Sequence, residues 1–97
     1  MKIYIAGKIT GDRDYKTKFK RAVQYWEKSG HIVLNPAELP EGMTASDYMR
    51  ICFAMIDSAD IVIFLKDYTY SKGARLEYEY CKYINKNYLI WGRKSGK

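Results

Sequence analysis

The apolar run IVIFL at residues 61–65 constrains the fold of this chain more than any other feature. An unbroken run of this length is typical of a strand buried on both faces, because a strand with one wet face alternates apolar and polar residues. Such a strand lies inside a parallel sheet whose two faces are both covered by helices. The run therefore indicates a domain of the α/β class.

Strand-like and helix-like segments alternate along the rest of the chain. Strand patterns are predicted at residues 2–6, 31–34, 61–65 and 88–91. Apolar residues with helical spacing predict helices near residues 14–29, 47–56 and 71–85. Parallel strands need crossover connections, and this order supplies a helix for each one. The predicted fold class is α/β: a small three-layer α/β/α domain, Rossmann-like or flavodoxin-like, with a four-stranded parallel sheet.

Composition supports one small packed domain. The chain has 97 residues, 47% of them hydrophobic, so residues 1–91 are expected to form the domain and the basic segment 92–97 a flexible tail. No apolar run approaches the roughly 20 residues of a membrane span, and the start lacks the apolar region of a secretory signal, so a cytoplasmic protein without a membrane partner is expected. One histidine and two unclustered cysteines indicate neither a metal site nor a disulfide, and no cofactor is expected.

The loops that follow the predicted strands are the candidate site, because ligands of parallel sheets bind beyond the carboxyl ends of the strands. The loop AGKITG after the first strand is neither a GxGxxG fingerprint nor a P-loop, which argues against both of those nucleotide sites. Gly7 can let a ligand approach the backbone, and Lys8 supplies a point charge, although a tight turn explains the same residues. On the third loop, Tyr68 and Tyr70 can stack on a base.

The segment SKGARLEYEY at residues 71–80 has the strongest chemical signal. With Ser71 as the N-cap, free amides at Gly73 and Ala74 would make the helix start an anion site. Glu77 lies roughly 9 Å further along the axis, and its side chain tilts back toward that start. A phosphate at Ser71 and the anomeric carbon of a pentose at Glu77 are then both in reach. The alternative is a plain helix cap and a solvated carboxylate paired with nearby basic residues.

Four stretches together resemble a known family: IYIAGKITG, NPAEL, DYMRICFAMIDSADIVIFL and SKGARLEYEYCK. They resemble small phage and bacterial proteins of the DUF4406 family, in the nucleoside 2-deoxyribosyltransferase-like superfamily. The resemblance extends over residues 2–90. Its most specific part is Ser-x-Gly-x-x-x-Glu, at Ser71, Gly73 and Glu77. By this resemblance, residues 1–91 form a nucleoside 2-deoxyribosyltransferase-like domain.

The resemblance implies an N-glycosidase or deoxyribosyltransferase. In that reading Glu77 is the nucleophile that takes the 2-deoxyribosyl group and passes it to another base or to water, as in retaining glycosidases. Serine at position 71, where an aspartate would repel a phosphate, implies a deoxynucleoside 5′-monophosphate as the substrate. Tyr4 at the end of the first strand and the Gly7–Lys8 loop are implied to line the pocket.

One position departs from the superfamily pattern. Enzymes of the superfamily commonly carry an aspartate in the helix before the third strand, where it binds the sugar or helps to protonate the base. Cys52 is the nearest equivalent here, and Asp57, almost a turn and a half later, is retained as a candidate substrate-binding residue. The departure leaves a second reading open, a non-catalytic module that senses or sequesters a nucleotide.

The net charge of +6 favours anionic partners without selecting among them. No groove-reading motif accompanies it, so a small nucleotide or deoxynucleotide is expected rather than a nucleic acid. Enzymes of the superfamily often complete the pocket with a neighbouring subunit. Aromatic residues on the second and third helices, namely Phe53, Tyr78 and Tyr80, favour a homodimer or higher homo-oligomer.

Overall fold

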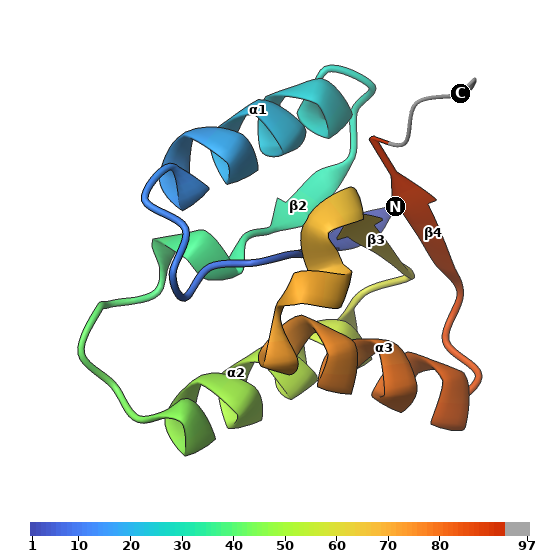
Figure 1. Ribbon diagram of the computed structural model, residues 1–97. Helices are drawn as coiled ribbons and strands as arrows, with labels where there is room; N and C mark the ends of the chain where they lie inside the picture. The colour runs from blue at the N-terminus through green and yellow to red at the C-terminus, as the bar shows by residue number, and fades with distance from the viewer. Residues whose placement is uncertain (93–97) are drawn as a thin grey trace.

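The computed structural model describes residues 1–92. Its centre is a four-stranded parallel sheet with the strand order β2-β1-β3-β4 (Figure 1). The strands are β1 (Lys2–Ala6), β2 (Ile32–Leu34), β3 (Ile61–Leu65) and β4 (Tyr88–Trp91). The predicted four-stranded parallel sheet is confirmed, and three of the four strands have the predicted bounds.

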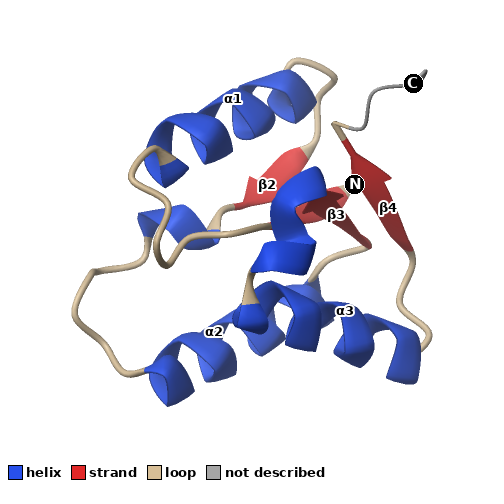
Figure 2. Ribbon diagram, in the orientation of Figure 1, coloured by secondary structure: helices blue, strands red, loops and turns tan. Residues whose placement is uncertain are grey.

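The helices cover both faces of the sheet. The helix α1 (Tyr15–Glu27) lies on one face, and α2 (Ala45–Ser58) and α3 (Lys72–Tyr83) lie together on the other (Figures 1 and 2). This division follows from the strand order. The chain moves from β1 to β2 in one direction and from β2 to β3 and β4 in the other, and right-handed crossovers place the connecting helices on opposite faces. The predicted three-layer architecture is confirmed.

Alternate residues of β1 and β3 form the two halves of the core. Ile3 and Ile5 pack toward α1 together with Phe19, while Tyr4 and Ala6 pack toward α2 and α3. Along β3 every residue after Ile61 is buried, which accounts for the unbroken apolar run in the sequence. Tyr4 is therefore the polar side chain that β1 directs into the α2 and α3 layer.

Side-chain caps mark the starts of α2 and α3. Thr44 and Asp47 form a reciprocal capping box at the start of α2, and Ser71 caps α3. The third helix ends at Tyr83, two residues before the predicted end, and Asn85 adopts a left-handed conformation with φ of 62°. Two segments expected as plain loops contain 3-10 turns, namely η1 (Pro36–Glu38) and η2 (Lys66–Tyr70).

The strand order reverses between β1 and β3, so a crevice is expected beyond their carboxyl ends. There the loop after β1 contacts η2 through Lys8. The Lys8 amide donates to Asp67 Oδ1 at 3.1 Å, and Lys8 Nζ donates to the carbonyl of Tyr70 at 3.1 Å. Two loops from distant parts of the sequence thus form one wall.

Gly7 is required by packing within the protein. A Cβ atom at this position would lie 2.9 Å from Leu65 Cδ1 and 3.2 Å from Asp67 Oδ1. The absent side chain therefore lets the loop after β1 lie against the end of β3. Ligand approach, the reason suggested by the sequence, is not needed to explain this glycine.

Of the segment 92–97, expected to be a flexible tail, residues 93–97 lie outside the described part of the chain. Within residues 1–92, no helix is long and apolar enough to cross a membrane.

We expect Gly7→Ala to lower the free energy of unfolding by about 1–3 kcal/mol, because the added methyl group must displace Leu65 or the loop. Gly73→Ala is the control, since its Cβ would meet Met49 Sδ at an ordinary 3.7 Å. We expect this control to change the stability by less than about 1 kcal/mol. Urea denaturation of both variants tests this, and equal stability of the two would contradict the packing argument.

Candidate functional site

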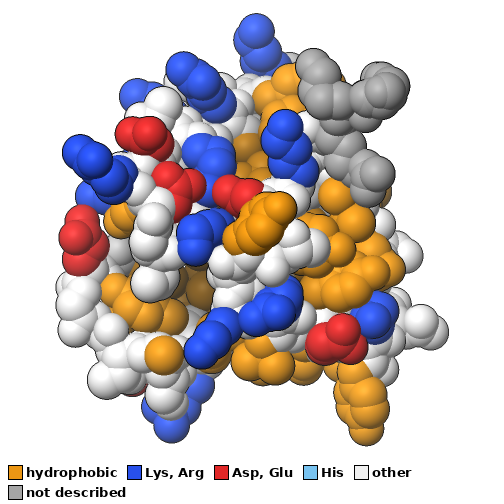
Figure 3. Space-filling view, viewed as in Figure 1, with side chains coloured by type: hydrophobic (Ala, Val, Ile, Leu, Met, Phe, Trp, Pro, Cys, Tyr) orange, Lys and Arg blue, Asp and Glu red, His pale blue; other side chains and the backbone are white. Residues whose placement is uncertain are grey.

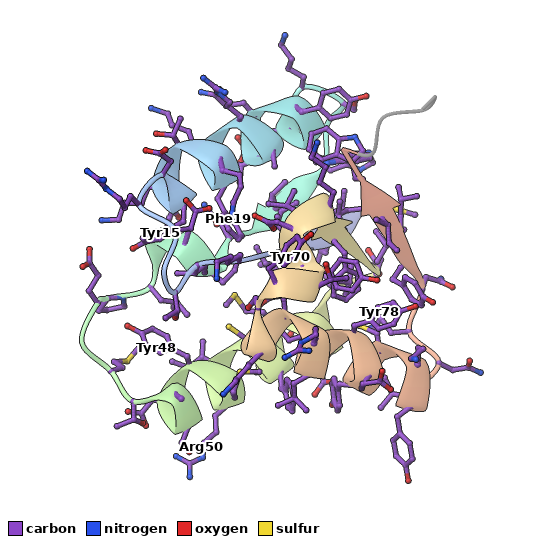
Figure 4. All side chains as sticks on the ribbon, in the orientation of Figure 1. Tyr15, Phe19, Tyr48, Arg50, Tyr70 and Tyr78 are labelled. Carbon is purple, nitrogen blue, oxygen red and sulfur yellow. The ribbon has the colours of Figure 1, made fainter. Side chains whose placement is uncertain are left out.

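A cleft of about 860 Å³ opens at the carboxyl edge of the sheet. Its walls come from the loop after β1, from η1, and from the starts of α2 and α3. Tyr15, Tyr48 and Tyr70 belong to three different elements around it (Figure 4). Six predicted site residues line this cleft: Tyr4, Gly7, Lys8, Ser71, Gly73 and Glu77.

Asp57 is the exception among the predicted site residues. It lies in the last turn of α2, at the opposite edge of the sheet from the cleft, and its Oδ1 accepts a hydrogen bond from the Tyr80 hydroxyl at 2.7 Å. Asp57 follows Cys52 by five residues of helix, which correspond to roughly 7.5 Å along the axis. The structure therefore separates Asp57 from the other candidates.

Glu77 is the one charged side chain in the buried core of the described residues. It is only 5% exposed and lies on the inner face of α3 with Ala74 and Cys81. The Tyr4 hydroxyl donates a hydrogen bond to Glu77 Oε2 at 2.8 Å. The alternative of a solvated carboxylate paired with basic neighbours is wrong, because the side chain points into the protein at the edge of the cleft.

Burial changes the acidity of the groups around Glu77. Desolvation raises the pKa of Glu77 from 4.5 to about 7, although its interactions with the Tyr4 hydroxyl and the Cys52 thiol lower it in part. Desolvation also raises the pKa of Cys52 to about 11 and that of Tyr4 well above its ordinary range. Near neutral pH, Tyr4 and Cys52 are thus protonated, while Glu77 exchanges between its two forms.

The start of α3 forms another part of the cleft. The Ser71 hydroxyl oxygen accepts a hydrogen bond from the Ala74 amide at 3.1 Å, so the prediction that this amide is free is wrong. Gly73 in the first turn lines the cleft without a side chain. Its amide belongs to the part of the helix that has no carbonyl partner within the helix. The positive end of the helix dipole therefore faces the cleft.

The acidic residues at the mouth of the cleft are paired with lysines. Lys18 Nζ lies 2.5 Å from Asp12 Oδ2, and Lys16 Nζ lies 2.9 Å from Glu41 Oε2. The hydrogen bond from Lys18 lowers the pKa of Asp12, so this carboxylate stays ionised. Figure 3 shows basic and acidic side chains side by side over the start of α1 and the loop that precedes it.

The basic residues that line the cleft are paired with carboxylates less often than its acidic residues are paired with lysines. Lys8, Arg13 and Lys72 all line it, and the contact of Lys8 Nζ is with a neutral carbonyl group. With Asp12 and Glu41 already paired, the charge available to a ligand at the α3 end of the cleft is positive. The cleft thus combines a buried carboxylate with a cationic rim.

Sequence reasoning missed some of these residues. Of the two tyrosines expected to stack on a base, Tyr70 lines the cleft, whereas Tyr68 packs with Phe64 and Tyr78 in an aromatic cluster. Tyr48 also lines the cleft, where its hydroxyl donates to the carbonyl of Pro40 at 2.5 Å. No local pattern distinguishes these tyrosines in the sequence, because tertiary packing decides which ones face the cleft.

We expect Glu77→Gln to stabilise the protein, and to do so more at about pH 8 than at about pH 5. The raised pKa means that ionisation of the buried carboxyl opposes folding, so this penalty is absent below about pH 4.5 and grows as the pH rises through about 7. Because each pKa unit corresponds to about 1.4 kcal/mol, the full penalty on the free energy of unfolding is roughly 3 kcal/mol.

The measurement is chemical denaturation of both proteins at the two pH values. Glutamine retains an oxygen that can accept the Tyr4 hydrogen bond, so the difference between the two pH values isolates the charge. A stability change that is the same at both pH values would contradict the assignment of a raised pKa to Glu77.

Comparison with known proteins identifies both the fold and the family. A solved structure described as a 2-deoxyribosyltransferase from the psychrotolerant bacterium Bacillus psychrosaccharolyticus superposes with a TM-score of 0.74 and 23% sequence identity, over 93% of this chain and 71% of that chain. This likeness shows a shared fold. No curated protein matches the chain. The family described as "Domain of unknown function (DUF4406)" matches residues 1–89. The chain therefore belongs to the DUF4406 family.

Proposed function

We propose that this protein cleaves or transfers the sugar at the N-glycosidic bond of a deoxynucleoside 5′-monophosphate, with Glu77 as the nucleophile. One observation carries the proposal: α3 contributes two parts of the same cleft. These are the Glu77 carboxylate, which is only 5% exposed, and the capped start of the helix, where the helix dipole is positive. The likeness to a 2-deoxyribosyltransferase supports the choice of a deoxyribosyl substrate.

In the first step, Glu77 attacks C1′ of the sugar from the face opposite the base. The hydrogen bond from Tyr4 occupies Oε2, so Oε1 is the oxygen proposed to attack. The new bond joins Oε1 to C1′, and the bond from C1′ to the base nitrogen breaks with its electron pair moving to the base, which takes a proton from water. Tyr4 keeps the carboxyl group in place, and burial leaves the ionised form poorly solvated and reactive.

In the second step, water or another base attacks C1′ of the glycosyl ester. The bond from C1′ to Oε1 breaks, its electron pair returns to the carboxylate, and a proton leaves the attacking group. Water gives hydrolysis, and a base gives transfer. Both outcomes follow from the same intermediate.

The phosphate is proposed to bind at the start of α3. Ser71 accepts a hydrogen bond from the Ala74 amide through its oxygen, so its own hydroxyl proton remains available for a phosphate oxygen. Gly73 allows a phosphate to approach the first turn, and Lys8 adds a positive charge. An ion at this helix end is favoured by the helix dipole.

A second candidate function is a nucleotide-binding module without turnover. The observation that favours it is Cys52, a thiol in the cleft whose pKa of about 11 leaves no readily donated proton beside Glu77. Calorimetry separates the two candidates, since a binding module gives heat on mixing with a deoxynucleoside monophosphate but releases no free base.

We expect Glu77→Ala to lower base release by at least about a thousandfold, because the attacking atom is lost. The control is Glu79→Gln on the same helix, an exposed carboxylate paired with Lys82, which we expect to retain activity. Ser71→Ala should raise KM roughly tenfold through the loss of one hydrogen bond to a charged group. Chromatographic detection of free base from the common deoxynucleoside monophosphates tests all three variants.

Two results would count against this assignment. Wild-type protein that releases no base from any of these nucleotides excludes the enzyme, and binding heat in the same samples then favours the module. Equal loss of activity in Glu79→Gln and Glu77→Ala would show that the effect is not specific to the buried carboxylate.

We expect the rate of base release at saturating substrate to rise about tenfold between about pH 6 and about pH 8. The reason is that the attacking form of Glu77 is the ionised one, and burial raises its pKa to about 7. The measurement is an initial-rate profile in buffers of constant ionic strength. A rate that is flat or falling over this range would contradict a carboxylate nucleophile with that pKa.

A further inference from the structure

Lys18 joins the two loops that border the cleft, and neither step of the proposed reaction uses it. Its ammonium group, on α1, donates hydrogen bonds to the carbonyl of Lys8 at 2.7 Å and to Asp12 Oδ2 at 2.5 Å. It also donates to Asp67 Oδ2, in η2. One side chain thus contacts three acceptors, two of them in the loop after β1 and the third in η2.

These contacts hold both the carbonyl and the amide group of the Lys8 backbone. Lys18 binds its carbonyl, and Asp67, itself paired with Lys18, accepts from its amide at 3.1 Å. The side chain of Lys8 then reaches across to the carbonyl of Tyr70 at 3.1 Å. Tyr70 directly precedes Ser71, the N-cap of α3. The ammonium group of Lys8 is therefore fixed beside the start of that helix.

The ion pair between Lys18 and Asp67 is partly buried. The side chains of Lys18 and Asp67 are 26% and 25% exposed, in contrast to 65% and 73% for the surface pair of Lys16 and Glu41. Partly buried charges are screened less by solvent and salt, so this pair holds its geometry better than a surface pair does. Close packing of Gly7 against Asp67 restricts the same wall further.

We propose that Lys18 is a positioning residue for anion recognition, which acts by holding the Lys8 ammonium group beside the first turn of α3. The inference rests on the proposed function, because it takes the phosphate of a deoxynucleoside monophosphate as the anion. Lys18 itself does not touch the ligand. It reduces the freedom that Lys8 must lose when the phosphate binds.

Calorimetry on Glu77→Gln protein tests the inference without consuming the ligand. The probes are the four common deoxynucleoside 5′-monophosphates and the matching deoxynucleosides, which lack the phosphate. We expect Lys18→Met to weaken monophosphate binding by about fivefold or more and to leave deoxynucleoside binding within about twofold. A residue that merely supports the fold would weaken both ligands alike.

Two further variants separate positioning from charge. Lys20→Met on the same helix removes an equal charge from an exposed lysine, and we expect monophosphate affinity to stay within about twofold of its parent. Lys8→Met should reproduce the phosphate-specific loss of Lys18→Met. If Lys18 acts through Lys8, the double substitution is no weaker than Lys8→Met alone, whereas independent effects would multiply.

The possible outcomes distinguish this inference from the proposed function. Monophosphate binding that is unchanged in Lys18→Met, or multiplied losses in the double variant, overturns the positioning role and leaves the proposed function standing. Failure of the parent protein to bind any monophosphate overturns both. Thermal denaturation checks folding, and if Lys18→Met does not fold, Lys18→Gln replaces it with the same expected phosphate-specific loss.

Discussion

A buried carboxylate held by a tyrosine is the interaction on which the proposed site depends. Glu77 is surrounded by the α2 and α3 half of the core, where an ionised group is poorly solvated, and a single hydrogen bond from Tyr4 compensates for part of that loss. An apolar residue at this position would favour folding more. The pair makes sense as part of a reactive site, where a poorly solvated carboxylate near its pKa is an effective nucleophile.

The fold supplies what surrounds this pair. Parallel strands bring the loop after β1 and the segment after β3 to one edge, and the reversal of strand order leaves a crevice between them. The helix α3, which follows β3, contributes both the proposed anion-binding start and, further along its axis, Glu77. The ligand proposed here has the same two features, a phosphate and an anomeric carbon one sugar ring apart. In this proposal, the wall that Lys18 holds completes the phosphate end.

Most of the fold could be predicted because the apolar pattern reports burial directly. The strands at residues 2–6, 61–65 and 88–91 have the predicted bounds, and in the first two nearly every side chain is buried. Helix ends follow less directly from the apolar pattern: α3 ends at Tyr83, and Asn85 beyond it adopts a left-handed conformation. The 3-10 turn η1 has a local cap, because the Asn35 side chain accepts a hydrogen bond from the Ala37 amide.

The site was predictable only in part. Glu77 could have been recognised as inward-facing, because it follows Ala74 by three residues and precedes Cys81 by four, which places all three on one helix face. The network around Lys18 could not, since Lys18 and its partner Asp67 are 49 positions apart in the sequence. Asp57 does not line the cleft, because the axis of α2 carries it away from the carboxyl edge of the sheet and toward Tyr80. Side-chain partners across loops are set by the packed structure.

The most direct measurement is a crystal structure of Glu77→Gln protein soaked with a deoxynucleoside 5′-monophosphate. The account predicts a phosphate at the first turn of α3, near Ser71 and Lys8, and C1′ of the sugar roughly 3–3.5 Å from the side-chain oxygen at position 77. A nucleotide bound with its sugar turned away from that oxygen, or with its phosphate outside the α3 start, would contradict the central claim.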